Sequence, residues 1–598
     1  MKNTRTCIHR HFKEAFRGAF QRLLCLTAGA TLLLSAGCAA EKTPEPTAPL
    51  LEEHEAAQTS APASGGVLAV NIPSNVSSFD PLTAYSKELQ NLLSLVYEPL
   101  LTYDSTNRLT AALAETWSTP DEGVTWEINL RRDVRWHGRQ DTMTAKDVLF
   151  TYNLLKSKAY AHSPYYELVE RIASMEAVDE YKLVVAGKEP GMQVLHSLVF
   201  PVVSKLHYQD NLGTGPYSLA YANPSVGAEL TANENWWKRT PYISRVVAQC
   251  LQEESGALPL LQIQEVNFVT TSSLTANTYR EEGVNSLVEL YTQHSEMLLL
   301  NQNSWRLQDK NVRKAIAYAL DRREIISKVY YNHAFACDVP VPPDSWLYDS
   351  ASKRYDVDLD KAKELLEQAG WKDYDGDGIR DKREEGGIAR LRLTLVVNDT
   401  PDNLTRQDAA KLIAEQLARV GIEVQISALK WTETENAYQT ALEAGGFDLA
   451  LMGVNLGRNG DLTELLKTGG GRNYGRYSST QMDGLLKQAA AAPSEKELKE
   501  VMTSIQSLFV EELPFIHLYF RTYSVVYSAK LSITQDLRDT EPFRSIEKWF
   551  FTPEGIALYS DMTLASAGAP PKLEQLASGE APEEEDPDGR EPGGEGER

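Results

Sequence analysis

Cysteine is scarce in this sequence, with 5 among 598 residues. Cys7 and Cys25 lie in a basic and apolar amino-terminal segment, and Cys38 follows that segment directly. Only Cys250 and Cys337 remain for the folded chain, too few for the disulfide framework that holds small secreted domains together. This pair either forms one bridge or stays as two thiols, and the sequence leaves both open.

Signatures of catalysis are also missing. The histidines are scattered with no pair at zinc-ligand spacing, and the sequence contains neither a Gly-x-Ser-x-Gly nor a zinc-protease motif. The glycine-rich stretch at 213–215 is followed by no phosphate-loop lysine, which argues against a nucleotide site. We therefore expect no enzyme, although paired carboxylates in a cleft would leave no signature in the sequence.

Long apolar runs are absent apart from residues 23–34, which are too few to span a bilayer. Six basic residues precede this run, as in an export signal. The run ends in Ser35-Ala36-Gly37-Cys38, which resembles the bacterial lipobox. We expect a signal peptide at 1–37, lipidation at Cys38, and a protein anchored by lipid to the outer face of the cell membrane; the alternative is an ordinary signal peptide with an incidental cysteine.

Positive charge is in deficit. Removing residues 1–37 takes away six basic residues and one acidic residue, so the formal net charge falls from −23 to −28. A surface of this sign repels the phosphate backbone, so we expect no nucleic-acid partner. Residues 38–65 read as a flexible tether, and residues 567–598, rich in Pro, Gly and Glu, as a disordered acidic tail.

The chain from 66 to 566 is too long for a single hydrophobic core, which stops growing near roughly 250–300 residues. Strand and helix patterns alternate in its later part: a strand at 391–397, a helix at 404–420 and a strand from 421. This alternation predicts an α/β fold.

The most informative stretch lies between Tyr97 and Tyr152. Val124 to Leu130 alternate in polarity as in a half-buried strand, and Val134 to Trp136 read as a second short strand. Thr144 to Asp147 has capping-box spacing and predicts the start of a helix.

The ordered set Leu113-Ala114-Glu115-x-Trp117, Trp126-x-Ile128-x-Leu130-Arg131, Val134-x-Trp136-His137 and Thr144-Ala145-x-Asp147-Val148 resembles the peptide/nickel family, family 5, of extracellular solute-binding proteins of ABC importers. Where that family usually shows His-Asp-Gly, this chain has His137-Gly138. The resemblance implies a two-lobed periplasmic-binding-protein-like fold (type II, cluster C) with an extra subdomain. It places lobe 1 at 66–107, 209–297 and 533–566, the subdomain at 108–208 and lobe 2 at 298–532.

The resemblance also implies a function without catalysis: a monomer that captures a small ligand between the lobes and delivers it to the permease subunits. Short peptides are the expected cargo, with oligosaccharide or chelated nickel as the alternative. Two other classes stay open, an exported enzyme and a surface adhesion or chaperone-like protein on the same scaffold.

For ligand binding, the resemblance points to the strand Phe447–Asn455, which carries Gly453 and Asn455, and to the loop after it. In peptide-binding members, an acidic residue of this loop pairs with the amino terminus of the peptide, and Asp461 matches it by position. The proline and the aromatic residue of the family loop are replaced here by Leu462 and Asn455, and Asp461 also suits a helix cap. Trp431 is a further candidate at a predicted lobe edge.

Residues 373–384 fit the twelve-residue calcium loop, and we call them the acidic loop. The pattern assigns the side chains of Asp373, Asp375, Asp377, Asp381 and Glu384 and the backbone carbonyl of Ile379. A strand pattern follows instead of a second helix, so this is no EF-hand pair, and a solvated acidic turn is the alternative. We expect no required cofactor and a structural calcium ion as the one candidate.

Overall fold

The computed structural model describes residues 61–251, 256–352, 355–400, 404–432 and 434–564. The predicted signal peptide, Cys38, residues 38–60 of the tether and the acidic tail lie outside these ranges. Among the described residues, no helix combines the length and the apolar character needed to cross a bilayer.

A four-stranded sheet brings two of the three predicted parts of lobe 1 together, 66–107 and 209–297. Its strand order is β1 (Val67–Pro73), β10 (Arg245–Leu251), β9 (Gly227–Ala232) and β8 (Tyr217–Asn223). The apolar start of β1 is buried, and β1 pairs in parallel with β10 although the two are far apart in the sequence. Helix α2 (Lys87–Leu93) begins where the Ser86 side chain accepts a hydrogen bond from the Leu89 N–H, 3.2 Å away.

A second four-stranded sheet forms within residues 108–208. Its order is β4 (Ala114–Ser118), β5 (Thr125–Leu130), β7 (Lys182–Gly187) and β6 (Ile172–Asp179), with the short pair β2 (Leu101–Tyr103) and β3 (Leu109–Ala111) nearby. The alternation that predicted β5 is confirmed, because Trp126, Ile128 and Leu130 are buried. The predicted strand at 134–136 is wrong: Arg135 makes only one isolated bridge, to Thr142.

The predicted capping box is confirmed at the start of α3 (Ala145–Lys156), where the Thr144 N–H donates to Asp147 Oδ2 at 2.9 Å. Helix α4 (Tyr166–Glu170) follows in the same region, and α5 (Ala257–Gln262) lies against the strand β11 (Phe268–Thr271).

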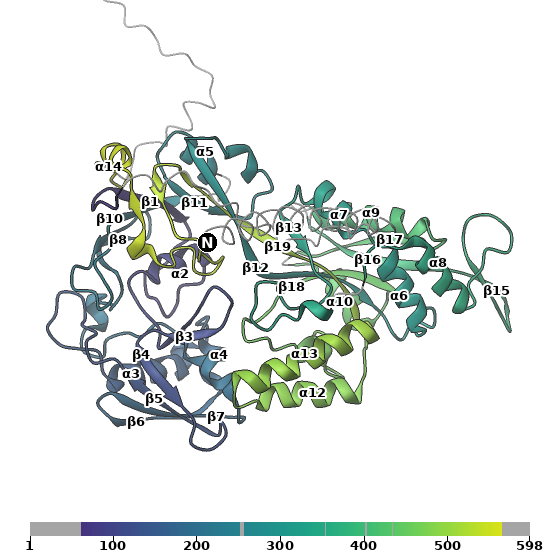
Figure 1. Ribbon diagram of the computed structural model, residues 1–598, viewed down its shortest axis with the longest axis horizontal. Coiled ribbons are helices and arrows are strands. Elements are labelled where there is room, and N and C mark those ends of the chain that lie inside the picture. Colours follow the sequence, from purple (N-terminus) through teal and green to yellow (C-terminus); the bar gives the residue numbers. More distant parts are fainter. Residues whose placement is uncertain (1–60, 252–255, 353–354, 401–403, 433, 565–598) are drawn as a thin grey trace, which may run out of the picture. The chain divides into compact units, whose positions relative to one another are not determined.

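The largest sheet contains two long antiparallel strands, β12 (Asn285–Leu300) and β19 (Phe515–Ser528) (Figure 1). They are neighbours in the interior of the sheet, and the other strands pair on either side of them. β19 pairs with β11 (Phe268–Thr271), and β12 pairs through His294 to Leu300 with β18 (Leu449–Asn455). The mutual register of β12 and β19 shifts between Tyr291 and Ser295. The predicted boundary at 297/298 therefore falls inside a continuous strand.

Beyond β18 the sheet continues with β16 (Arg392–Asp399) and β17 (Glu423–Lys430), while the short β13 (Ala334–Ala336) pairs with β19. The predicted strand–helix–strand alternation is confirmed here, with α9 (Thr405–Ala418) between β16 and β17. The other helices of this region are α6 (Lys310–Ala319), α7 (Arg322–Val329), α8 (Leu359–Gln368), α10 (Ala437–Ala444), α11 (Thr463–Leu466), α12 (Thr480–Ala491) and α13 (Glu495–Glu512).

Two small ribbons complete the fold. One consists of β14 (Asp381–Glu384) and β15 (Gly387–Arg390), and the other of β20 (Leu531–Ser532) and β21 (Phe550–Phe551), followed by α14 (Pro553–Tyr559).

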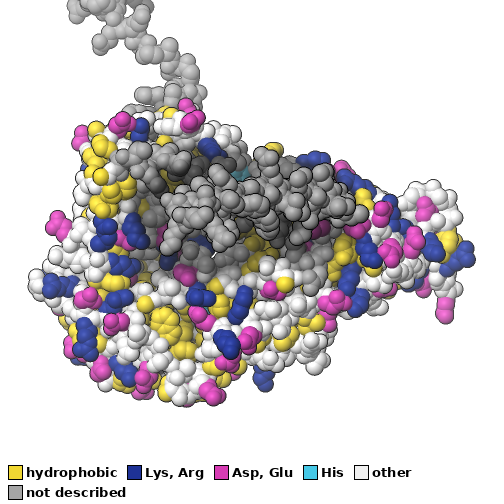
Figure 2. Space-filling model, viewed as in Figure 1, with side chains coloured by type: hydrophobic (Ala, Val, Ile, Leu, Met, Phe, Trp, Pro, Cys, Tyr) yellow, Lys and Arg dark blue, Asp and Glu magenta, His cyan; other side chains and the backbone are white. Residues whose placement is uncertain are grey.

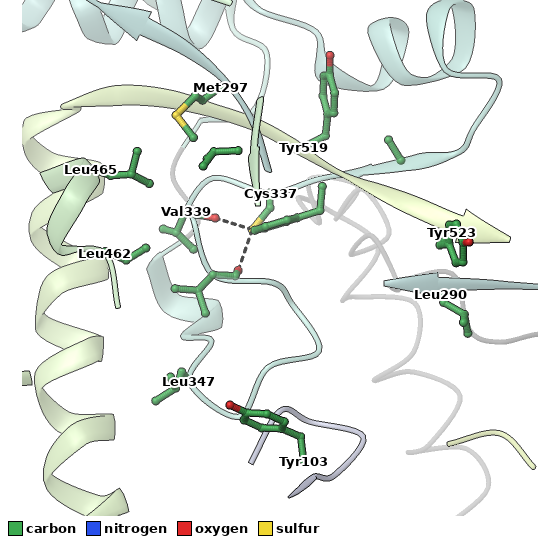
Figure 3. Close-up of a cluster of buried hydrophobic side chains, with 14 of the residues drawn as sticks. Tyr103, Leu290, Met297, Cys337, Val339, Leu347, Leu462, Leu465, Tyr519 and Tyr523 are labelled. Carbon is green, nitrogen blue, oxygen red and sulfur yellow. Dashed lines mark hydrogen bonds between the residues drawn. The ribbon is translucent and has the colours of Figure 1, made fainter. Parts of the chain in front are cut away.

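Both remaining cysteines are free thiols, so the bridge that the sequence left open is not formed. Cys337 is buried among apolar side chains that include Met297, Leu347 and Tyr519 (Figure 3). Its thiol donates to the Val339 carbonyl at 3.2 Å, and burial raises the pKa of Cys337 to about 12. On the surface, Lys and Arg side chains alternate with Asp and Glu over the face in view, without a basic stripe (Figure 2).

Candidate functional site

The carboxyl ends of three parallel strands form the first candidate site. β16 lies between β17 and β18 and is parallel to both. The chain runs from β16 to β17 on one side and then crosses to β18 on the other, and open sheets bind ligands outside the strand ends at such a reversal. We call this edge the strand-end site. Its residues are His294, Glu296, Asn398, Arg406, Trp431, Gly453 and Asn455.

A buried ion pair organises the strand-end site. Glu296 of β12 is 2% exposed, and both of its carboxylate oxygens accept hydrogen bonds from Arg406 in the first turn of α9. Nε donates to Oε2 at 2.9 Å and Nη2 to Oε1 at 3.0 Å, while Nη1 donates to Asn398 Oδ1 at 3.0 Å. This two-pronged geometry holds the guanidinium in one orientation at the ends of β16 and β18.

Each member of this pair stabilises the charged form of the other. Burial alone would raise the pKa of Glu296, but the Arg406 guanidinium and the His294 ring hold it well below its usual range. His294 lies next to the carboxylate, with Nε2 at 3.1 Å from Glu296 Oε1 and Nδ1 at 3.1 Å from Asn455 Oδ1. The site therefore presents an ionised pair connected through His294 to Asn455.

Gly453 has a packing reason to be glycine. A Cβ built on Gly453 would lie 2.0 Å from Arg406 Nη2 and 2.9 Å from Glu296 Oε1. The guanidinium thus crosses the backbone of β18 where no side chain fits. Gly453 makes room for the ion pair, whereas Asn455, two residues later, is exposed at the end of the strand.

Trp431 follows β17 at the same edge. Its backbone N–H donates to the Asp399 carbonyl at 3.1 Å, which attaches it to the end of β16. Its ring is 41% exposed and tilts by 30° against Tyr438 of α10, with centroids 5.7 Å apart. Since Tyr438 is buried, Trp431 offers a supported aromatic surface to a ligand at the strand-end site.

The loop at 456–462 leads away from β18 and carries Asp461. The Asp461 carboxylate is exposed and accepts a hydrogen bond from the Thr463 N–H at 3.0 Å, at the start of α11. Within this loop, Asn459 Nδ2 donates to Gln193 Oε1 at 2.9 Å, and Arg458 Nη1 to Glu541 Oε1 at 3.1 Å. The loop therefore joins lobe 2 to the subdomain and to the segment after β20.

A cavity of about 370 Å³ lies beside α2, and we call it the α2 cavity. Its walls are mostly apolar, and they include Leu93, Leu95, Tyr97, Leu101, Tyr103 and Phe543. Arg458 reaches it from the loop after β18, so the loop connects the strand-end site with the cavity. Small-molecule sites have this size and this apolar lining with few polar groups.

One buried and one partly buried charged group, Glu98 and Lys87, line the α2 cavity. Burial raises the pKa of Glu98, whose carboxylate accepts from Trp237 Nε1 at 3.0 Å. Burial lowers the pKa of Lys87, against the opposing effect of Asp539 at 3.4 Å. Both charges are therefore costly to maintain without polar partners inside the cavity.

The acidic loop lies apart from these sites, between α8 and the β14–β15 ribbon (Figure 1). The structure brings Asp373, Asp375 and Asp377 together, with one carboxylate oxygen of each within 4.8 Å of the others. Asp381 and Glu384 stand three residues apart in β14, so their side chains point to opposite faces. Glu384 instead pairs with Lys382 at 3.7 Å, away from the cluster.

Sequence reasoning missed four residues of the strand-end site: His294, Glu296, Asn398 and Arg406. Glu296 directly precedes an apolar run in the sequence, which suggests a buried position. An acidic residue is almost never fully buried unless it is paired, so this position could have indicated a buried ion pair. The partner of Glu296 lies 110 residues away, and nothing in the local pattern identifies it.

Comparisons with known proteins agree with this architecture. The family model of bacterial extracellular solute-binding proteins, family 5 middle region, matches residues 108–474. The oligopeptide-binding protein AppA of Bacillus subtilis is 25% identical over 513 residues, which cover 82% of this chain and 92% of AppA. The dipeptide-binding protein of Escherichia coli is 24% identical over 452 residues, 68% of this chain and 80% of that protein.

Solved structures show the same fold. The AppA complex with a nonapeptide from Bacillus subtilis has a TM-score of 0.58 at 24% identity, covering 82% of this chain and all of that one. The nickel ABC transporter from Bacillus halodurans has a TM-score of 0.69 at 20% identity, covering 80% of this chain and 98% of that one. The predicted two-lobed fold is thereby confirmed. The chain belongs to the bacterial extracellular solute-binding proteins of family 5, which are substrate-binding proteins of ABC transporters and not enzymes.

Proposed function

We propose that this protein captures short peptides at the strand-end site and delivers them unchanged to the permease subunits of an ABC importer. The observation that carries this proposal is the loop at 456–462, which leads from the exposed end of β18 to the α2 cavity, where Arg458 lines the wall. A peptide lying along this path meets groups from both lobes. Binding groups from both lobes at once favours the closed state, because only that state makes all the contacts.

Asn455, Trp431 and Asp461 each have a role in this proposal. The end of β18 around Asn455 offers main-chain groups to an extended peptide, which would add to the strand with little sequence preference. Trp431 packs against an apolar part of the peptide, and Asp461 pairs with its amino terminus. The α2 cavity takes one side chain of the peptide, and no cofactor takes part.

We further propose that the protein works as a monomer, held at the outer face of the membrane by a lipid on Cys38. The anchor rests on the sequence of residues 23–38, which lie outside the described ranges, and the monomer on the family resemblance.

The test is a titration of the processed full-length protein with a panel of ligands, followed by calorimetry and thermal unfolding. The panel contains short peptides, their N-acetylated forms, oligosaccharides and a nickel–histidine chelate. Saturable binding of free peptides, with the peptides recovered intact, supports the proposal. Binding only of sugars or of the chelate would establish the alternative cargo, cleavage of the peptides an enzyme, and no response at all an adhesion role.

A further inference from the structure

The acidic loop holds more negative charge than its own residues neutralise. Asp373 accepts hydrogen bonds from the Gly376 and Gly378 N–H groups at 2.7 and 3.0 Å, and Asp377 accepts from the Ile379 N–H at 2.9 Å. Gly378 adopts a φ of +88°, which permits the sharp turn at the sixth position of the calcium pattern. The three carboxylates are exposed and face one another.

One cation of the chain reaches this cluster. Arg390 at the end of β15 contacts Asp377 through Nη2, and the same nitrogen lies 3.3 Å from Asp375 Oδ2. All three side chains are at least one-third exposed, so this ion pair is weakened by solvent. The guanidinium thus sits where a metal ion would bind, and it is held there only loosely.

Asp381 of the acidic loop is buried, although its carboxylate is not one of the three that lie within 4.8 Å of one another. Asp381 is 3% exposed, and its Oδ1 atom accepts no hydrogen bond. Asp381 stands directly opposite Arg390 in the β14–β15 ribbon, and directly opposite residues of an antiparallel pair share one face. Asp381 therefore points to the same side from which Arg390 reaches Asp375 and Asp377. A buried carboxylate oxygen without a hydrogen bond is costly, and a cation would relieve that cost.

We propose that the acidic loop is a calcium site formed by Asp373, Asp375, Asp377 and Asp381, and that Arg390 is its internal competitor. Calcium prefers oxygen ligands of this kind, and the Ile379 carbonyl supplies the seventh-position ligand of the pattern. The ion displaces the Arg390 guanidinium and binds the Asp381 side. Glu384 takes no part, since it faces the other way.

The position of the site gives the ion a structural role. Asp381 exchanges backbone hydrogen bonds with Lys372 at 2.8 Å, and the adjacent Arg380 donates to the Trp371 and Val420 carbonyls. Calcium at this point fixes the end of α8 against β14 and the turn before β17. This inference does not depend on which cargo the protein carries.

The test is calorimetric titration of the chelator-treated, processed full-length protein with calcium chloride, together with thermal unfolding. We expect one saturable site per chain with a dissociation constant on the order of 0.1–1 mM, as in extracellular calcium modules. Arg390→Gln removes the competitor and tightens binding about fivefold, the equivalent of one exposed ion pair. Arg383→Gln is the matched control: it removes the same charge from the same ribbon, but its guanidinium lies 4.7 Å above the Tyr374 ring and leaves the affinity unchanged.

Two further variants keep the proposal falsifiable. Asp377→Asn changes an exposed loop residue and abolishes calcium binding, and Asp381→Asn weakens it even where the buried substitution lowers stability. A wild-type protein without saturable binding or thermal shift in calcium would overturn the site. Unchanged affinity in Asp381→Asn or in Arg390→Gln would overturn the assignment of these residues.

Discussion

Arg458 donates a hydrogen bond from Nη1 to Glu541 Oε1 at 3.1 Å, and the guanidinium also lies 4.7 Å above the Tyr103 ring. Glu541 accepts further hydrogen bonds from Thr102 Oγ1 at 3.1 Å and from Arg544 Nη1 at 2.8 Å. One carboxylate thus gathers the loop after β18, β2 and the segment after β20 at the rim of the α2 cavity. The protein itself supplies this connection between its two halves.

Arg458→Gln should therefore weaken cargo binding, even if the cargo does not touch the ion pair of Arg458 and Glu541. The Arg458 and Glu541 side chains are 18% and 22% exposed, so their charge-assisted bond is partly shielded from water. Its loss lowers the population of the closed state, and we expect the peptide dissociation constant to rise about tenfold. Calorimetry measures the constant. Arg472→Gln, an exposed arginine of the same lobe, is the control, and equal constants in both variants would contradict the role of the pair.

Gly453→Ala should destabilise the protein by about 2–3 kcal/mol, because the new Cβ collides with Arg406 Nη2 and forces the buried pair apart. Gly484→Ala is the matched control. Gly484 lies exposed in α12 with nothing within 4 Å of a built Cβ, so its replacement should stabilise by about 0.5–1 kcal/mol. Urea denaturation gives both values. Equal effects of the two substitutions would show that Gly453 tolerates a side chain.

Local signals predicted much of the fold. Alternating polarity predicted β5, and a capping box predicted the start of α3. The order strand–helix–strand predicted β16, α9 and β17. Each of these patterns is complete within one element. The prediction failed at 134–136, where a short apolar run finds only a single bridge partner.

The site was less accessible to sequence reasoning, because its geometry is nonlocal. The pair of Glu296 and Arg406 joins β12 to α9 across the sheet, and only the parallel order of β16, β17 and β18 brings Trp431 to the same edge as Asn455. For Glu384, a local pattern assigned a residue that the structure places elsewhere. The calcium pattern assumes a helix after the loop, but a strand follows, and its alternation turns the Glu384 side chain to the face opposite that of Asp381.

Acidification should destabilise the protein through His137. Gly213 N–H donates to Nδ1 at 3.2 Å and Nε2–H donates to the Gly215 carbonyl at 3.0 Å, so the buried ring is neutral. Burial lowers the pKa of His137 to about 4, against the opposing effect of the Gly215 carbonyl. The unfolded chain takes up this proton from about pH 6.5, so the contribution to stability is complete above that pH and is lost as the pH falls toward 4.

Within this window we expect His137 to add about 1.4 kcal/mol per pH unit to the slope of the unfolding free energy. His137→Gln keeps a donor and an acceptor but does not titrate, so its slope should be smaller than that of the wild type. Urea denaturation across a pH series measures the slopes. His162→Gln replaces an exposed histidine and should keep the wild-type slope; a wild-type slope in His137→Gln would refute the assignment.

Asp461 separates two roles that the structure and the sequence assign to one side chain. Its Oδ1 atom accepts from the Thr463 N–H at 3.0 Å, and its charge is the proposed partner of a peptide amino terminus. Asp461→Asn keeps an oxygen that can accept this bond but removes the charge, whereas Asp461→Ala removes both. A charge-assisted hydrogen bond contributes about 1.5–3 kcal/mol, so both variants should bind free peptides about ten- to a hundredfold more weakly.

Only Asp461→Ala should also lose thermal stability, because only there the Thr463 N–H is left without the side-chain acceptor. N-acetylated peptides provide the internal control, since they carry no ammonium group and should bind wild type and Asp461→Asn equally. If calorimetry gave the same affinity for free peptides in wild type and Asp461→Asn, the carboxylate would serve the backbone of α11 alone. The amino terminus of the cargo would then have to be recognised elsewhere along the strand-end site.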